Sequence, residues 1–300
     1  MQEPSLAIFS NFFIDNEERF LRMKDSFNSF KDINPNEWII NIRGSLKNQA
    51  GEFLKKKLGD KLQLSFLQNS RGWLHDSSII ANKITSRYVF YWIEDQILIA
   101  PLTTLKQCIA EMSVFNTDQL CYSWFIPHNT VPFKIVKVEK QGRYISLQKI
   151  DSDACDKIRN ECKKYRVHRY IKDFYIISLA SIMSKSFFNR ILKSPKPYLK
   201  RWDKSLPFDF EKRSKDNVLP VIWHAVSKEE LFVPIDDDGG LPGYSLISRG
   251  QYPNRVSREQ MKQAEFGSKN KLMLILKKIT PKPIRKVGLF IKRIFWTLNI

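Results

Sequence analysis

Two adjacent carboxylates, Glu94 and Asp95, end an apolar and aromatic run that begins at Tyr88. Hard cations such as Mg²⁺ and Mn²⁺ take oxygen ligands, and Mg²⁺ typically uses only one or two protein carboxylates beside substrate phosphates and water. Successive side chains of a strand point to opposite faces, so we expect only one acid, Asp95, to bind the metal directly. The pair predicts a metal and phosphate site at a strand end. The alternative is that Asp95 caps a following helix.

The elements before these acids alternate between strands and helices. Alternating or continuous apolar runs predict strands over 6–13, 37–44 and 61–69, and helical spacing predicts helices over 15–33, 51–60 and 75–86, with Asp76 as a candidate cap for the last. Strands separated by helices of this length favour an α/β fold, a Rossmann-type mostly parallel sheet flanked by helices. Ligands of such sheets bind beyond the carboxyl ends of the strands. The polar residues expected at this rim are Asn11, Arg43, Arg71, Trp73, Glu94 and Asp95.

The pattern changes after residue 102. A helix is predicted over 103–115, and 131–150 is typical of a hairpin that turns at Gln141–Gly142. Residues 151–215 carry Lys and Arg among aromatic residues, and the acids Asp236 to Asp238 favour a solvated loop tip over a metal cluster.

Composition limits the possible partners and the compartment. The formal net charge is +19 over 300 residues, which indicates an anionic partner such as nucleic acid, a lipid surface or a phosphorylated substrate. The four cysteines show no C-x-x-C spacing, and the start of the chain has no signal-peptide pattern. We therefore expect a reducing cytoplasmic compartment. The sequence has no uninterrupted apolar stretch of eighteen or more residues, so we expect no membrane-spanning helix.

The order of strands and helices that leads to "SRYVFYWIEDQ" resembles the nucleotide-binding half of GT-A glycosyltransferases, in particular the family-2-like group. In that group a hydrophobic strand ends in a DxD metal motif, and here Glu94-Asp95 stands in its place. The resemblance covers about residues 5–125, and "NIRG" replaces the acid usually found after the second strand. It implies that Asn11 and Arg43 lie near the nucleotide, that "RGWLHDS", with Arg71, Trp73 and Asp76, lies near the ribose and diphosphate, and that Glu94 faces the donor sugar.

The resemblance also implies an acceptor half, residues 126–268, in the same catalytic domain as the nucleotide-sugar half, residues 1–125. In inverting members a carboxylate of that half deprotonates the attacking hydroxyl, and an aromatic residue stacks on the acceptor. The candidates are Glu211, then Asp209, for the base and Trp202 for the stacking; the alternative is that the acids pair with neighbouring basic residues on the surface. His224 could be a further metal ligand, although a histidine between apolar residues is more often structural.

The last segment, residues 269–300, predicts a basic amphipathic tail. Ile284, Val287, Ile291, Ile294 and Leu298 share one helical face flanked by Lys and Arg, which is typical of a helix in the interface of an anionic membrane. The alternatives are a helix docked on the protein itself and a tail that binds nucleic acid.

These observations predict a cytoplasmic glycosyltransferase at the inner face of the membrane, attached through residues 284–298. It would use Mg²⁺ or Mn²⁺ and move a sugar from a nucleotide-diphosphate donor to a glycan or lipid-linked glycan, in bacterial surface polysaccharide synthesis, with no nucleic-acid partner. A different class, a basic nucleic-acid-binding protein or metal-dependent nuclease, stays open because Tyr165, Tyr170 and Trp202 lie among basic residues. A catalytically inactive GT-A scaffold that recruits partners is the third hypothesis.

Overall fold

The structure is a computed structural model, and it describes residues 4–69, 71–124, 135–164, 177–194, 207, 210, 219–236 and 243–255. Glu211, Asp209, Trp202, Tyr165, Tyr170 and the tail 269–300 lie outside these residues. The hypotheses on the catalytic base, the acceptor, nucleic acid and the membrane therefore stay predictions. Within the described residues, no helix is both long and apolar enough to cross a bilayer.

A nine-stranded sheet organises the described chain, in the order β3-β2-β1-β4-β9-β6-β10-β8-β7. The strands are β1 (Leu6–Phe13), β2 (Glu37–Arg43), β3 (Leu62–Ser65), β4 (Tyr88–Tyr91), β6 (Gln119–Cys121), β7 (Val138–Gln141), β8 (Ile145–Ile150), β9 (Ser181–Ser184) and β10 (Ile222–Ser227). Only β9 and β8 run against the direction of the other strands in this sheet. The predicted α/β class with a mostly parallel sheet is confirmed.

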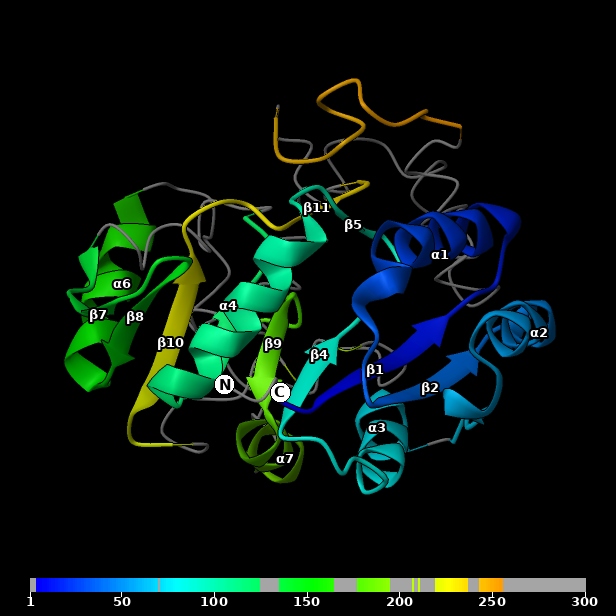
Figure 1. The fold of residues 1–300 in the computed structure, drawn as a ribbon, viewed down its shortest axis with the longest axis horizontal. Coiled ribbons are helices and arrows are strands. Elements are labelled where there is room, and N and C mark those ends of the chain that lie inside the picture. The colour runs from blue at the N-terminus through cyan, green and yellow to red at the C-terminus, as the bar shows by residue number, and fades with distance from the viewer. Residues whose placement is uncertain are drawn as a thin grey trace, which may run out of the picture. The chain divides into compact units, whose positions relative to one another are not determined.

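Helices cover both faces of the sheet (Figure 1). One face packs against α1 (Glu17–Phe30), α2 (Lys47–Leu58) and α4 (Leu102–Phe115). The other packs against α3 (Trp73–Ala81), α6 (Ser152–Lys164) and α7 (Lys185–Lys193). β1 alternates between the two cores, since Ile8 and Phe12 face α1 whereas Ala7 and Phe9 face α3. Both faces of the sheet are therefore buried under helices, which explains why the strands are near-continuous apolar runs in the sequence.

The acids after β4 lead into a strand rather than a helix. β5 (Gln96–Leu98) follows at once and pairs antiparallel with β11 (Phe232–Pro234), more than 130 residues later. Helix α4 begins only at Leu102, with Pro101 at its N-cap. The alternative that Asp95 caps a following helix is therefore wrong.

Gly44 lets the end of β2 lie against the end of β1. It has φ +97°, and a Cβ added there would lie 2.3 Å from the carbonyl oxygen of Ile14. Ile14 in turn donates its N–H to Arg43 and accepts from Leu46, so the backbone of Ile14 cannot move away without breaking both hydrogen bonds.

We predict that Gly44→Ala lowers the free energy of unfolding by about 3 kcal/mol or more, because backbone strain and steric overlap add together. Gly250→Ala is the matched control, since Gly250 also has positive φ (+68°) but open space at the Cβ position. It should cost about 1–2 kcal/mol. Denaturant unfolding followed by circular dichroism measures both, and equal losses would contradict the role of the Ile14 contact.

Candidate functional site

The first part of the site is a buried polar network at the carboxyl ends of β1 and β2. Asn11 and Asn41 are opposite each other in the parallel register, and both point to the α3 side. The Asn11 amide donates to the Trp73 carbonyl (3.2 Å) and to Ser77 Oγ (2.9 Å), and its Oδ1 accepts from Asn41 Nδ2 (2.8 Å) and Arg43 Nε (2.9 Å). These four hydrogen bonds fill the capacity of an amide side chain. Asn11 therefore positions Arg43 and α3 and has no hydrogen bond left for a ligand.

Asn41 and Ser77 belong to this network, and the sequence interpretation missed both. Asn41 donates to the carbonyl of Leu67 (2.9 Å) and accepts from its N–H (2.7 Å), which holds the loop between β3 and α3 against β2. The sequence did contain a signal for this role, because Asn41 is a polar residue that interrupts the apolar run of "EWIINIR".

The residues expected near the ribose and diphosphate have different environments. Trp73 is 1% exposed, donates its indole N–H to the Asn11 carbonyl (3.2 Å) and packs against Tyr91. Asp76 is equally buried and lies inside α3, where it accepts hydrogen bonds from the backbone and side chain of Asn69, so Gly72 rather than Asp76 is the N-cap. Arg71 is exposed in the turn before α3. Of these three, Arg71 is the side chain accessible to a ligand.

The second part of the site is the acid turn, residues 93–96, which connects β4 to β5. Its backbone is bonded from several elements: Ile235 N–H to the Asp95 carbonyl (2.7 Å), Ser26 Oγ of α1 to the Gln96 carbonyl (2.5 Å), and Ser10 Oγ of β1 to the Trp92 carbonyl (2.8 Å) just before it. Both acids are partly exposed. The turn thus presents two carboxylates from a backbone with fixed geometry, which favours binding over a flexible surface loop.

Asp95 also acts on a buried neighbour. Burial raises the pKa of Tyr122 well above its usual value, and the charges of Cys121 and Asp95 raise it further. The Tyr122 hydroxyl donates to the Tyr91 carbonyl at the end of β4 (2.8 Å). The carboxylate of Asp95 is therefore within electrostatic range of Tyr122, a residue that bonds to the end of β4.

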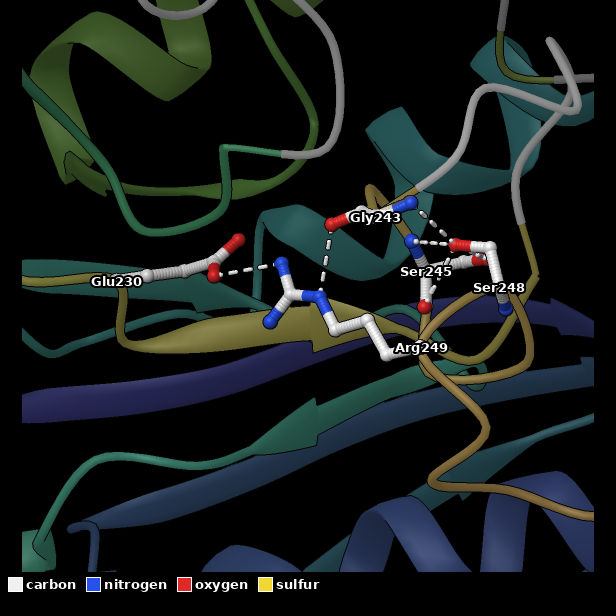
Figure 2. Close-up of polar contacts among 5 residues, drawn as sticks. All are labelled: Glu230, Gly243, Ser245, Ser248 and Arg249. Atoms are coloured by element: carbon white, nitrogen blue, oxygen red, sulfur yellow. Dashed lines mark hydrogen bonds and ion pairs between the residues drawn. The ribbon is translucent and has the colours of Figure 1, made fainter.

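A segment after β11, residues 243–252, packs against the small β5–β11 sheet. Its backbone donates from Leu246 to Pro234 (2.9 Å) and from Ile247 to Ile235 (3.0 Å). Arg249 holds this segment in place through two contacts (Figure 2). It pairs with Glu230 (2.9 Å), and it donates a hydrogen bond to the carbonyl of Gly243 at the start of the segment (2.8 Å). This segment, residues 243–252, is called the strap; it supports Ile235, the residue directly after β11, whose N–H bonds to the Asp95 carbonyl.

Arginine burial distinguishes this edge of the sheet from the rest of the described chain. Among the described residues the buried Lys or Arg side chains are Arg19, Arg22 and Arg43, with 7%, 3% and 4% exposure. Arg43 ends β2, and the other two lie in the first two turns of α1, directly after β1. The guanidinium carbons of Arg19 and Arg43 lie over the Phe13 ring at 5.6 and 5.5 Å from its centroid. The sequence interpretation missed Arg19 and Arg22.

The residues present fit a hard cation that is shared with a ligand. No group of three or more His, Cys, Asp or Glu side chains that could hold a metal occurs in the described ranges, so they do not form an all-protein metal cage. Two adjacent carboxylates on a fixed turn match the smaller protein contribution that Mg²⁺ uses when phosphates and water complete its shell.

His224 lies away from the acid turn. It is in the middle of β10, level with Gln119 of β6, and β6 and β9 separate β10 from β4 in the sheet order. It is 5% exposed, and burial lowers its pKa to about 4. The imidazole is therefore neutral at pH 7.

We predict that His224 makes stability depend on pH between about 6.5 and 4. In this range the unfolded chain binds a proton at His224 that the folded chain does not bind, so stability falls as pH falls, by about 3 kcal/mol in total. His224→Gln should flatten this part of the stability–pH profile, and His75→Gln, a partly exposed histidine of α3, should not. Denaturant unfolding at several pH values tests this, and an unchanged slope in His224→Gln would refute it.

Comparisons with known proteins give structural matches only. No family model and no curated protein sequence matches the chain. The S. aureus TarS 1–349 structure matches with a TM-score of 0.46 and 14% identity, over 76% of this chain and 59% of that one. The same fragment in complex with UDP matches with a TM-score of 0.43 and 15% identity, over 76% of this chain and 59% of that one. The mannosyltransferase PcManGT from Pyrobaculum calidifontis, in complex with GDP-Man and Mn²⁺, matches with a TM-score of 0.35 and 14% identity, over 44% of this chain and 39% of that one. The matched part thus spans less than two thirds of these proteins, and likeness at this level assigns no function.

Proposed function

We propose that the chain is a glycosyltransferase that moves a sugar from a nucleotide-diphosphate donor to an acceptor hydroxyl. One observation carries the proposal: the buried arginines and the acid turn gather at the carboxyl ends of β1, β2 and β4. This is the edge where open α/β sheets bind ligands. A diphosphate needs cationic groups, and a shared divalent cation needs carboxylates beside them.

The helix termini supply further positive potential at the same edge. α1 begins four residues after β1 ends, with the Asn16 side chain as its N-cap, and the first residue of α3, Trp73, donates to the Asn11 carbonyl near the end of β1. The N-terminus of a helix carries a partial positive charge that favours phosphate. Both helix ends, together with Arg43 and exposed Arg71, would hold the diphosphate of the donor.

In the reaction the acceptor oxygen forms a bond to the anomeric carbon of the sugar while the bond from that carbon to the diphosphate breaks. The acceptor proton goes to a carboxylate, for which Glu211 and then Asp209 are our candidates, with Trp202 stacked on the acceptor. This single displacement inverts the anomeric configuration. A Mg²⁺ or Mn²⁺ ion held by Asp95, with Glu94 toward the sugar, would stabilise the charge of the departing diphosphate.

The proposal extends to the setting of the enzyme. The basic amphipathic tail, residues 284–298, would hold it on the anionic inner face of the cell membrane. A lipid-linked glycan acceptor would be reached there, and assembly of a bacterial surface polysaccharide is the process in which we expect this transfer. The charge pattern of the tail supports this part of the proposal.

We predict that Asp95→Asn lowers the rate of sugar transfer at least about 100-fold, because the variant keeps the shape of the side chain but loses the negative charge that holds the cation. Its melting temperature should stay near that of the wild type, because the variant keeps the hydrogen bonds from Ile235 and Ser26 that hold the backbone of the turn. Asp60→Asn, an exposed acid near the end of α2, is the control. Turnover in Asp95→Asn equal to the control would remove the acid turn from the active site.

We also predict that nucleoside diphosphates raise the melting temperature more in the presence of Mn²⁺ than in EDTA. A ligand at 100 times its Kd stabilises the folded state by about 2.7 kcal/mol, which corresponds to a shift of several degrees. UDP and GDP are the first probes, each compared with its nucleoside. A panel in which no diphosphate stabilises the protein more than its nucleoside would contradict the proposed function.

A further inference from the structure

Arg22 is the most buried of the three arginines at the edge, and its hydrogen-bonding capacity is incompletely used. Its side chain is 4% exposed, and Nε donates to Glu18 Oε1 at 2.9 Å, one turn earlier on α1. Nη1 lies 3.7 Å from Asp236 Oδ2, which is an ion pair but too long for a good hydrogen bond. Nη2 is buried and has no hydrogen-bond partner among the residues that the structure describes. A buried guanidinium donor without an acceptor is costly, so it calls for a specific explanation.

Two residues, Ser26 and Asp236, place Arg22 beside the acid turn. Ser26, one helical turn further along α1, bonds to the Gln96 carbonyl and accepts from the indole of Trp92 (2.8 Å). Asp236, the ion-pair partner, directly follows Ile235, whose N–H bonds to the Asp95 carbonyl. The unpartnered nitrogen of Arg22 thus lies in the region between α1, the acid turn and the end of β11.

We infer that Arg22 binds a phosphate oxygen of the donor's diphosphate, so that the guanidinium is fully hydrogen-bonded only in the donor complex. This inference rests on the proposed function and adds a diphosphate-binding residue to it. A planar guanidinium can bind phosphate through two parallel hydrogen bonds, and such charge-assisted bonds are about twice as strong as neutral ones. Glu18 holds Nε and so orients the remaining donors before the ligand arrives.

Asp236 has an opposing role in this arrangement. Its carboxylate is 30% exposed, and its distance to Nη1 leaves the pair weakly held. An incoming phosphate would compete with Asp236 for the same guanidinium and would be repelled by its charge. Removal of the Asp236 charge should therefore strengthen diphosphate binding, whereas a purely structural Arg22–Asp236 pair predicts no gain.

The test measures binding of inorganic pyrophosphate, UDP, GDP and the two nucleosides to the full chain by calorimetry in EDTA, so that no divalent cation contributes. We expect Arg22→Lys to weaken pyrophosphate binding about 10-fold and Arg22→Gln about 30- to 100-fold, with the affinity for nucleoside unchanged. Asp236→Asn should bind pyrophosphate several-fold more tightly than the wild type. Arg87→Gln is the control, because Arg87 is exposed at the amino end of β4 and bonds to Ser113 and Asn116.

The outcomes separate the two proposals. If the wild-type protein binds diphosphates no better than nucleosides both in EDTA and with Mn²⁺, the proposed function and the role of Arg22 both fail. If the wild-type protein prefers diphosphates only with Mn²⁺, the role of Arg22 alone fails. If the wild-type preference for diphosphate persists in both Arg22 variants, only the role of Arg22 fails. Equal losses of affinity for nucleoside and for diphosphate in the Arg22 variants would show that Arg22 only supports the local structure, and so would weaker pyrophosphate binding by Asp236→Asn. If Arg22→Gln does not fold, Arg22→Lys alone decides the question.

Discussion

The parallel pairing of β1 with β2 on one side and β4 on the other is the constraint on which the candidate site depends. This pairing sets Asn11 beside Asn41, Phe13 beside Arg43 and Phe9 beside Tyr91. A shift of one residue would turn Asn11 or Asn41 to the α1 face and would bury amides among apolar side chains. Because both faces of these strands are packed, the register is strongly specified, and the positions of the polar groups follow from it.

The acid turn depends on contacts that are distant in sequence. Its position after β4 could be predicted because the apolar run stops at Glu94. Its backbone, however, is held by α1 and by Ile235, and β5 is only three residues long. Such a short strand is stable because β11 and the strap behind it supply the other side of a small core made of Val233, Ile235 and Leu246. No local pattern contains this pairing, so the sequence instead allowed a helix cap at Asp95.

The strands and helices up to β4 were predictable because each has a local sequence pattern typical of its secondary structure. Helical spacing in α1, the glycine after α2 and the alternation of strands all agree with the fold, and the hairpin of β7 and β8 turns where expected. The order of the remaining strands was not predictable. β9, late in the sequence, inserts between β4 and β6, and short antiparallel insertions of this kind depend on tertiary packing. Likewise Asp236, expected at a solvated loop tip, pairs with Arg22 of α1, 214 positions earlier in the sequence.

In the proposed function, burial of the arginines, more than net charge, determines where the diphosphate binds. A formal charge of +19 indicates an anionic partner but does not locate it, because exposed lysines and arginines are hydrated and screened by salt within about 10 Å. Buried charges act through a lower effective dielectric constant and are screened far less. A guanidinium group that is 3–7% exposed is also expensive to bury, and the chain meets this cost for three arginines within one edge of the sheet. Fixed acceptors such as Asn11 and Glu18 orient two of them through Nε, which leaves their terminal nitrogens directed by the scaffold rather than by solvent. Because these guanidinium groups are already ordered in the free protein, an anion that binds them does not have to offset the entropy cost of ordering their side chains.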